Sequence, residues 1–331
     1  MKKVLVFGAT GNLGAYTIDY LYEYLDTTEY EIIAVGRKKT DFFERYNVKY
    51  VQLDVTNTAD FLKLPTENVY AVVDFVGILP AHLSGFNPGI YADVNVRGTI
   101  NILEYCRQNK VDRIIYTQTE ADLAGHWDKT FVIKPDMPRS IILSGNYAIY
   151  CITKSAAVDL IETYWNNFNL KRFIFRLPNI YHYKPSPYFY KNGKKQYSNY
   201  RYLIEQAIAG NPIEVWGDPT RAKDIVYVKD FAQMVYKAII ADCNGGLYNA
   251  GTGIATTLDD QIKGIVEVFS PANNKSQLIY CPDKPDSRSY LMDIENAKRD
   301  LGYEPRYSYI DYLRDFKIEM QKNRFADLWD E

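Results

Sequence analysis

The first two dozen residues limit the possible folds more than any other stretch of this chain. The run KKVLVFGA is apolar and closes on glycine, and NLGAYTIDYLYEYL then places apolar residues at helical spacing. Gly8, Gly11 and Gly14 lie between them at intervals of three. In such a unit the first glycine permits a tight turn, the second lets the backbone approach a pyrophosphate, and the third lets the helix pack on the strand. Because the helix start presents free N–H groups to an anion, the stretch predicts a dinucleotide-binding unit.

Further strands and helices alternate along the first half of the chain. Short apolar runs occur at EIIAVG, VKYVQLDV, YAVVDFVG and DRIIYTQT, and helical patterns cover 91–108 and 147–166. This alternation indicates a parallel sheet covered on both faces. We therefore expect an α/β fold in which residues 1–180 form a Rossmann-type, doubly wound parallel sheet. Residues 181–331 are expected to form mainly a smaller C-terminal α/β lobe that binds substrate, with the chain crossing between the two.

Residues 182–200 are rich in Tyr, Pro and Lys and show no apolar period, so we interpret them as a long loop. Shorter elements follow the loop. Helices are predicted near 201–209, 230–241, 257–269, 294–300 and 309–321, and a strand is predicted at IEVWG.

Composition excludes several classes of function. The 331 residues are 47% hydrophobic and 24% charged with a net charge of −2, so no basic face for nucleic acid is expected. No apolar run approaches the roughly 20 residues of a membrane span. Glycines interrupt the apolar N-terminal run, which favours a buried strand over a signal peptide. The three His and the four Cys (Cys106, Cys151, Cys243 and Cys281) form no cluster, so we expect no metal and a reducing, cytoplasmic location.

The end of the second predicted strand bears on the choice of cofactor. An acid there would hold the ribose 2′-hydroxyl of NAD, but the chain has Gly36-Arg37-Lys38. Arg37 suits a 2′-phosphate, which favours NADP(H) over NAD(H), and the alternative is a solvated basic loop. Asp54, after VKYVQL, is a candidate partner of the adenine amino group, or simply the start of a turn.

A tyrosine precedes a lysine by four positions in three places: Tyr150/Lys154, Tyr190/Lys194 and Tyr280/Lys284. In a chain with 30 tyrosines this spacing arises easily by chance, so spacing cannot choose between the pairs. On a helix, residues four apart share one face.

Several stretches together resemble one known family. They are GATGNLG, LDV, DFVG, NVRGTINILEYCRQNKVDRIIYTQT, YCITK, RLPNIY, GDPTRAKDIVYVKD, YNAGTG and DSRSYLMDIENAKRDLGYEP. In this order they resemble the extended short-chain dehydrogenase/reductase family, in its nucleotide-sugar epimerase/dehydratase branch, from residue 4 to about 316. The resemblance implies a Rossmann domain with a small substrate lobe, and a homodimer formed through the helices at 91–108 and 147–166.

The resemblance implies hydride transfer at a sugar carbon. Tyr150 is then the acid/base and Lys154 its partner, and Thr119 holds the reacting oxygen, with Thr117 as the competing hydroxyl. A free phenol has a pKa of about 10 and is a poor base at neutral pH. A nearby ammonium and a positive nicotinamide ring would favour the phenolate.

The same resemblance implies further contacts. For the cofactor they are Thr10, Asn12, Leu13, Val55, Phe75, Val76, Gly77, Asn95 and Pro178. For a nucleotide sugar they are Asn179 and Arg288 at the diphosphate, Val215 and Trp216 at the base, and Arg221 or Lys223 as a further cation. The alternatives are core positions for Phe75–Gly77, Val215 and Trp216, and a surface arginine for Arg288.

The chain also departs from the family pattern. Dehydratases of this branch usually carry Glu two positions after the catalytic Thr, but Ala121 stands there, and Glu120 or Asp122 would replace it only with a re-routed backbone. Lys223 stands where Arg is common. We therefore expect a 4-epimerase. The alternatives are an NADPH-dependent 4-ketoreductase, a reductase of a small carbonyl, a dehydratase or a non-catalytic NADP-binding protein.

Overall fold

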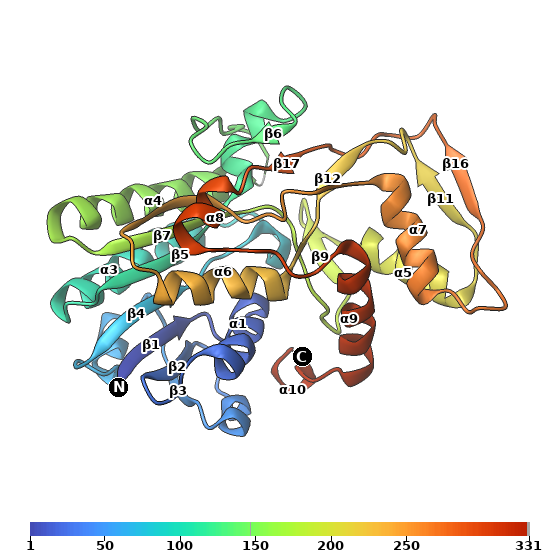
Figure 1. The fold of residues 1–331 in the computed structure, drawn as a ribbon. Helices are drawn as coiled ribbons and strands as arrows, with labels where there is room; N and C mark the ends of the chain where they lie inside the picture. The colour runs from blue at the N-terminus through green and yellow to red at the C-terminus, as the bar shows by residue number, and fades with distance from the viewer. Residues whose placement is uncertain (146, 330–331) are drawn as a thin grey trace.

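A seven-stranded, fully parallel sheet forms the centre of the molecule, with strand order β14-β7-β5-β4-β1-β2-β3 (Figure 1). The computed structural model describes residues 1–145 and 147–329. The strands are β1 (Lys2–Phe7), β2 (Tyr30–Gly36), β3 (Lys49–Gln52), β4 (Val69–Asp74), β5 (Arg113–Thr119), β7 (Lys171–Leu177) and β14 (Gly245–Asn249). The strand order reverses at β1, as in a doubly wound sheet, so the predicted fold class is confirmed.

Helices cover both faces of this sheet. Along β4, Val72 belongs to the core beneath α3 (Thr99–Gln108) and α4 (Tyr147–Phe168), whereas Val73 belongs to the core beneath α1 (Asn12–Tyr24) and α6 (Val228–Ile240). Because side chains alternate across a strand, a strand buried on both faces must be apolar at nearly every position. Burial on both faces explains why the apolar runs of these strands are unbroken in the sequence.

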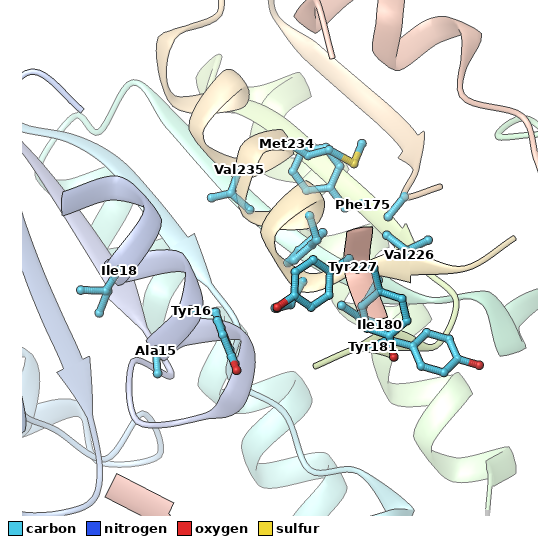
Figure 2. Close-up of a cluster of buried hydrophobic side chains, with 14 of the residues drawn as sticks. Ala15, Tyr16, Ile18, Phe175, Ile180, Tyr181, Val226, Tyr227, Met234 and Val235 are labelled. Atoms are coloured by element: carbon cyan, nitrogen blue, oxygen red, sulfur yellow. The ribbon is translucent and has the colours of Figure 1, made fainter. Parts of the chain in front are cut away.

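The core between α1 and α6 reaches toward the second lobe. Tyr16 and Ile18 of α1 lie near Met234 and Val235 of α6, and Phe175 comes from the sheet beside them (Figure 2). Tyr16 also donates a hydrogen bond to the Tyr183 carbonyl at 3.1 Å. The first helix of the nucleotide-binding unit is thus packed directly against the segment that leads into the smaller lobe.

The smaller lobe lies beyond the carboxyl ends of the strands, at the right of Figure 1. It contains α5 (Asn199–Ala209), α7 (Leu258–Phe269) and α9 (Tyr309–Lys322), and the parallel pair β11 (Ile213–Trp216) and β16 (Leu278–Cys281). The chain returns to the large sheet for α6 and β14 before it completes this lobe. The remaining elements are β8 (Ile180–Tyr181) with β13 (Val226–Tyr227), β6 (Val132–Ile133) with β17 (Leu291–Met292), β12 (Ala222–Asp224) with β15 (Ala255–Thr257), α8 (Glu295–Leu301) and α10 (Ala326–Trp329).

Two sequence-based expectations need correction. The predicted loop at 182–200 contains a β-hairpin, β9 (Tyr188–Lys191) with β10 (Lys194–Tyr197). Its two-residue turn is Asn192-Gly193, with φ of 52° and 73°. An Asn-Gly pair is a strong hairpin signal, but no apolar period accompanied it, because neither face of the hairpin is buried. The predicted helix at 91–108 is continuous but includes a π-helical segment, Ala92–Gly98, between α2 (Pro88–Tyr91) and α3.

A buried ion pair ties the end of β5 to its neighbour β7. Arg176 of β7 donates to both carboxylate oxygens of Asp122, with Nε–Oδ1 at 3.0 Å and a second nitrogen to Oδ2 at 3.1 Å. The two side chains are 2% and 1% exposed. Arg176 also donates to the Pro135 carbonyl at 2.9 Å and to Asn249 of β14 at 3.4 Å. The guanidinium therefore holds four segments at the carboxyl end of the sheet.

Replacing Arg176 with Met should destabilise the protein strongly. Removing one partner of a buried ion pair typically costs about 3–5 kcal/mol, because the other charge stays buried alone. Arg314→Met is the matched control, since Arg314 is 61% exposed and its nearest carboxylate contact is at 3.6 Å. It should change the free energy of unfolding by no more than about 1 kcal/mol. Chemical denaturation measures both, and similar values for the two variants would contradict the structural role of Arg176.

Candidate active site

The glycine loop has the geometry that its three glycines predict. Gly8 has φ of +75°, and a Cβ there would lie 3.0 Å from the Phe75 carbonyl carbon. A Cβ on Gly14 would lie 2.3 Å from the Gly8 oxygen, so only glycine lets α1 approach β1 this closely. Gly11 is the N-terminal residue flanking α1, and no side chain caps the helix there. The loop can therefore approach an anion with its backbone.

Thr10, Asn12 and Leu13 lie in this loop and in the first turn of α1, as predicted. The C-terminal helix α10 also reaches the loop, because Trp329 donates its indole N–H to the Thr10 carbonyl at 3.1 Å. Sequence reasoning missed this contact, since 319 positions separate the two residues. The helix thus contacts the glycine loop from the opposite end of the chain.

Arg37 is exposed just beyond β2, and its backbone carbonyl accepts a hydrogen bond from Gln52 at 3.1 Å. The neighbouring Lys38 instead donates to the Leu328 carbonyl of α10 at 2.9 Å. Gly36 lies beneath, where a Cβ would be 3.2 Å from the Thr10 hydroxyl. Of the two cations, Arg37 is therefore the better placed to meet a phosphate.

Asp54 uses its Oδ1 atom to start a turn, accepting from the Thr56 N–H at 2.9 Å and hydroxyl at 2.8 Å. This is the turn-starting role that the sequence left as the alternative. Val55 is buried, and a Cβ on Gly98 would lie 2.7 Å from its side chain. Its contribution to a ligand site would therefore come from the backbone.

Residues after β4 form a wall between the glycine loop and α4. Phe75 and Val76 are half-buried, and Val76 donates its N–H to the Asp74 carboxylate at 2.9 Å. A Cβ on Gly77 would lie 3.6 Å from the Asn95 amide oxygen and 3.8 Å from the Lys154 ammonium. Gly77 thus keeps the space beside Lys154 open.

Asn95 is 1% exposed and joins this wall to α4. Its oxygen accepts from the Ile78 N–H at 2.8 Å, and its nitrogen donates to the Thr153 hydroxyl at 3.1 Å. Asn95 lies in the π-helical segment Ala92–Gly98, and π-turns occur often at functional sites. The predicted supporting role of Asn95 agrees with these bonds.

Among the three Tyr–Lys pairs, Tyr150/Lys154 lies on a helix, α4. Tyr190 belongs to β9 and Tyr280 to β16, where residues four apart do not share the geometry of a helical turn. Tyr150 is 8% exposed and Lys154 3%. The helical context therefore separates one pair from the two that share only its spacing.

Thr119 lies at the end of β5, and its hydroxyl is close enough to the Tyr150 phenol to act on its pKa. Its hydroxyl also accepts from the Ala121 N–H at 3.2 Å, which starts the following 3₁₀ turn. Burial raises the pKa of Tyr150 well above its ordinary value, and the Thr119 hydroxyl opposes that shift. The competing Thr117 is buried one strand repeat earlier. The geometry thus favours Thr119.

Pro178 is buried and Asn179 is exposed between β7 and β8. In β11, Val215 is fully buried, whereas Trp216 is 47% exposed. Successive strand residues point to opposite faces, so the two side chains cannot line one surface. The expectation for Val215 is corrected accordingly, because its side chain belongs to the core.

Three predicted cations meet at the segment 286–290. Arg288 forms a two-pronged ion pair with Glu120, at 2.8 and 2.5 Å, and its guanidinium lies 4.0 Å from the Trp127 ring centroid. Arg221 donates to the Ser287 carbonyl at 2.9 Å. Lys223 bridges to Tyr290 through the backbone. The structure thus brings Arg288 to Glu120, which directly follows Thr119, whereas Arg221 and Lys223 contact the neighbouring residues Ser287 and Tyr290.

Sequence reasoning missed the structural roles of Glu120, Trp127 and Asp74. An acidic residue closing an apolar strand, as Asp74 does in YAVVDFVG, is a signal that could have been used, because a buried carboxylate needs a partner. The other two depend on long-range contacts. Across residues 1–145 and 147–329, no group of three potential metal ligands comes together, and no helix is long and apolar enough to cross a membrane.

Several known proteins are similar to this chain. UDP-glucuronate 4-epimerase of Thermodesulfobacterium geofontis is 26% identical over 263 residues, covering 79% of this chain and 76% of that protein. Human dTDP-D-glucose 4,6-dehydratase is 24% identical, covering 92% and 86%. The crystal structure of UDP-glucuronic acid 4-epimerase from Bacillus cereus in complex with NAD shares the fold, with a TM-score of 0.70, 21% identity, and coverage of 97% and 98%.

The model of the NAD dependent epimerase/dehydratase family matches residues 4–251, which is most of the chain. The match includes the glycine loop, Thr119, Tyr150 and Lys154. The predicted family and the expectation of an enzyme are both confirmed. The chain belongs to the NAD dependent epimerase/dehydratase family, an extended short-chain dehydrogenase/reductase.

Proposed function

We propose that this enzyme is an NAD(P)-dependent nucleotide-sugar epimerase that acts by transient oxidation at a sugar carbon, C4. The observation that carries the proposal is the position of the Thr119 hydroxyl beside the Tyr150 phenol, with Lys154 one helical turn away. Gly8, Gly14 and Gly77, where a Cβ would meet neighbouring atoms, form a cradle that fits a dinucleotide. Acid/base, oxygen holder and cofactor cradle therefore lie at one end of the sheet.

In the proposed reaction Tyr150 removes the proton of the sugar hydroxyl, and Thr119 donates a hydrogen bond to the same oxygen. The chemistry that NAD(P)⁺ supplies when bound is reversible hydride acceptance beside a positively charged ring. Burial disfavours the phenolate of Tyr150, so the charge of Lys154 and the bond from Thr119 have to offset it. Return of the proton by Tyr150 closes the cycle.

We propose a nucleotide sugar as the substrate. Arg288 lies in the segment 286–290, which Arg221 and the backbone of Lys223 contact, and a guanidinium suits a diphosphate well. Trp216 offers an exposed ring for the base, and Asn179 an exposed amide for the diphosphate. The named relatives act on UDP or dTDP sugars. To bind the diphosphate, Arg288 would have to give up one of its two hydrogen bonds to Glu120.

Dehydration is the weaker reading of this site. The position that carries Glu in the dehydratases is Ala121, which is buried beside Tyr150. Asp122 is held by Arg176, and Glu120 keeps part of its bond with Arg288 when the diphosphate is bound, so neither carboxylate is free to replace it. A 4-ketoreductase is the second candidate, because the exposed Arg37 suits an exchanging NADPH.

Three further proposals accompany this function. A division into two lobes near residue 180 would separate cofactor binding from substrate binding. The last two residues of the second lobe, 330–331, lie outside the described part of the chain. A homodimer through the outer faces of α3 and α4 is supported by the exposed Ile100, Ile152 and Phe168. A cytoplasmic location is supported by Cys106, Cys151, Cys243 and Cys281, which are all free thiols.

The purified enzyme should carry a tightly bound cofactor. An epimerase returns the hydride that it removes, so the cofactor need not leave. Denaturing the protein and identifying the released nucleotide by absorbance and mass should give near-stoichiometric NAD or NADP. An empty site that binds NADPH reversibly would instead favour the ketoreductase.

Tyr150→Phe should reduce turnover about 100- to 10,000-fold, because the acid/base group is lost. Cofactor binding, followed by fluorescence, should be unchanged. Tyr280→Phe is the matched control, because Tyr280 also precedes a lysine by four positions but lies on β16 with its hydroxyl on Asp259. Full activity of the Tyr150 variant would refute the assignment.

Arg37→Asp should weaken NADPH binding about 10- to 100-fold and leave NADH binding nearly unchanged, because the lost bonds are charge-assisted bonds to the 2′-phosphate. Lys39→Asp, two residues on and also exposed, controls for net charge. Titration of both cofactors against each variant decides the point. An equal loss for NADPH and NADH would exclude the 2′-phosphate role.

A further inference from the structure

One carboxylate stands inside the otherwise apolar centre of the sheet. Asp74, the last residue of β4, lies in register with Phe7 of β1 and Tyr116 of β5. It is 1% exposed. Because side chains alternate along a strand, Asp74 shares the face of Val72, which is covered by α3 and α4. A charge is thus placed beneath the helix that carries Tyr150 and Lys154.

The hydrogen bonds of Asp74 leave half of the carboxylate without a donor. Oδ1 accepts from the Val76 N–H at 2.9 Å. Within the described residues, neither Oδ2 nor the neighbouring Tyr116 hydroxyl has a hydrogen-bond partner. A buried, ionised oxygen of this kind is costly unless an opposite charge lies nearby.

Lys154 supplies that opposite charge. Its ammonium lies 3.9 Å from the centroid of the Tyr116 ring, the ring that neighbours Asp74 in the sheet. The titratable groups that face Asp74 are Lys154 from α4, Tyr116 from β5 and Cys106 from α3. The last two are neutral, because burial and Asp74 hold the pKa of each well above its ordinary value.

On each of the two groups, Asp74 and Lys154, burial and the opposite charge act on the pKa in opposite directions. Burial raises the pKa of Asp74 to about 6, and the Lys154 charge opposes the rise. Burial lowers the pKa of Lys154 to about 8, and Asp74 opposes the fall. Between about pH 6 and pH 8 both groups are therefore charged. Below this window Asp74 is neutral and Lys154 remains as a lone buried charge. Above it Lys154 is neutral and Asp74 remains as a lone buried charge.

We propose that Asp74 is a positioning residue, whose buried carboxylate is the counter-charge that keeps the Lys154 ammonium charged and in place over Tyr116 beside Gly77. The proposal rests on the function proposed above for Lys154, and it adds a residue that acts through Lys154 without touching substrate. Loss of the carboxylate leaves the ammonium buried without an opposite charge, so Lys154 gives up its proton at lower pH.

The first test uses the protein as purified and observes Lys154 directly. With ¹³C-labelled lysine, the Cε signal of Lys154 is identified by its absence in Lys154→Met, and NMR follows it from pH 5 to pH 9. We expect a main titration near pH 8 and a second inflection near pH 6, where Asp74 takes up a proton. A signal without the inflection near pH 6 would overturn the proposal without any Asp74 variant.

The second test replaces Asp74 with Asn, which keeps the shape and the acceptor for the Val76 N–H. The titration of Lys154 should move down by about one pH unit or more, and such a shift leaves about fivefold less protonated Lys154 at pH 8. Turnover should fall by the same factor at pH 8 and change little at pH 6.5. An unchanged Lys154 titration in Asp74→Asn would overturn the proposal.

Asp230→Asn is the matched control. Asp230 is also 1% exposed, and burial raises its pKa to about 6, but it lies on α6 and accepts from the Arg306 N–H at 2.7 Å. Its variant should leave the Lys154 titration unchanged, and a shift as large as that of Asp74→Asn would count against a specific pair. The NMR result does not depend on catalysis, so a failure of the charge pair and a failure of the proposed reaction are distinguishable.

Discussion

The ion pair between Arg176 and Asp122 is the contact on which the carboxyl end of the sheet depends. Both groups are removed from water, and such a pair stabilises the fold only when its remaining hydrogen bonds are also made. Asn249 meets this requirement by accepting from Arg176 and donating to the carbonyls of Ile133 and Asp293. The network joins the carboxyl ends of β5, β7 and β14 to Asp293, which directly follows β17. Thr119, three residues before Asp122, takes its position from this framework.

Two arginines determine what the acids after Thr119 can do. Arg176 holds Asp122 inside the protein, and Arg288 holds Glu120 at the edge of the smaller lobe. A carboxylate that is paired with an arginine is a poor base. If it took up a proton it would lose its negative charge, and the charge of the arginine would be left without a partner. The site that remains contains one phenol and one hydroxyl for proton movement. A reaction that oxidises and reduces one carbon needs no more, whereas elimination of water needs an additional base.

A charged residue at the end of strand β4 lies beneath the candidate site. A Rossmann sheet normally offers apolar residues to its helices, and β4 does so until Asp74. The carboxylate there faces Lys154, whose ammonium would lie 3.8 Å from a Cβ on Gly77. The helix α4 thus presents a phenol and an ammonium whose charge is balanced from within the core. In this proposal the proton chemistry of these buried side chains is linked to the packing of the sheet.

Much of this architecture could be predicted because it depends on neighbouring residues. The glycine loop, the alternation of strands and helices, and the placement of Tyr150 and Lys154 on one helical face follow from local periods and from backbone positions that only glycine can occupy. The hairpin at Asn192-Gly193 had a local signal too, but its polar faces hid the strands.

The pairing of charges was decided by the tertiary structure alone. Glu120 meets Arg288 across 168 positions, Asp122 meets Arg176 across 54, and Trp329 meets the glycine loop across 319. Asp74 and Lys154 come from a strand and a helix that the sequence cannot place face to face. A single sequence determines which residues can carry charge and where chain segments begin and end. The partner of each buried charge depends on which segments the fold brings together, because the field of a charge acts through space and not along the chain.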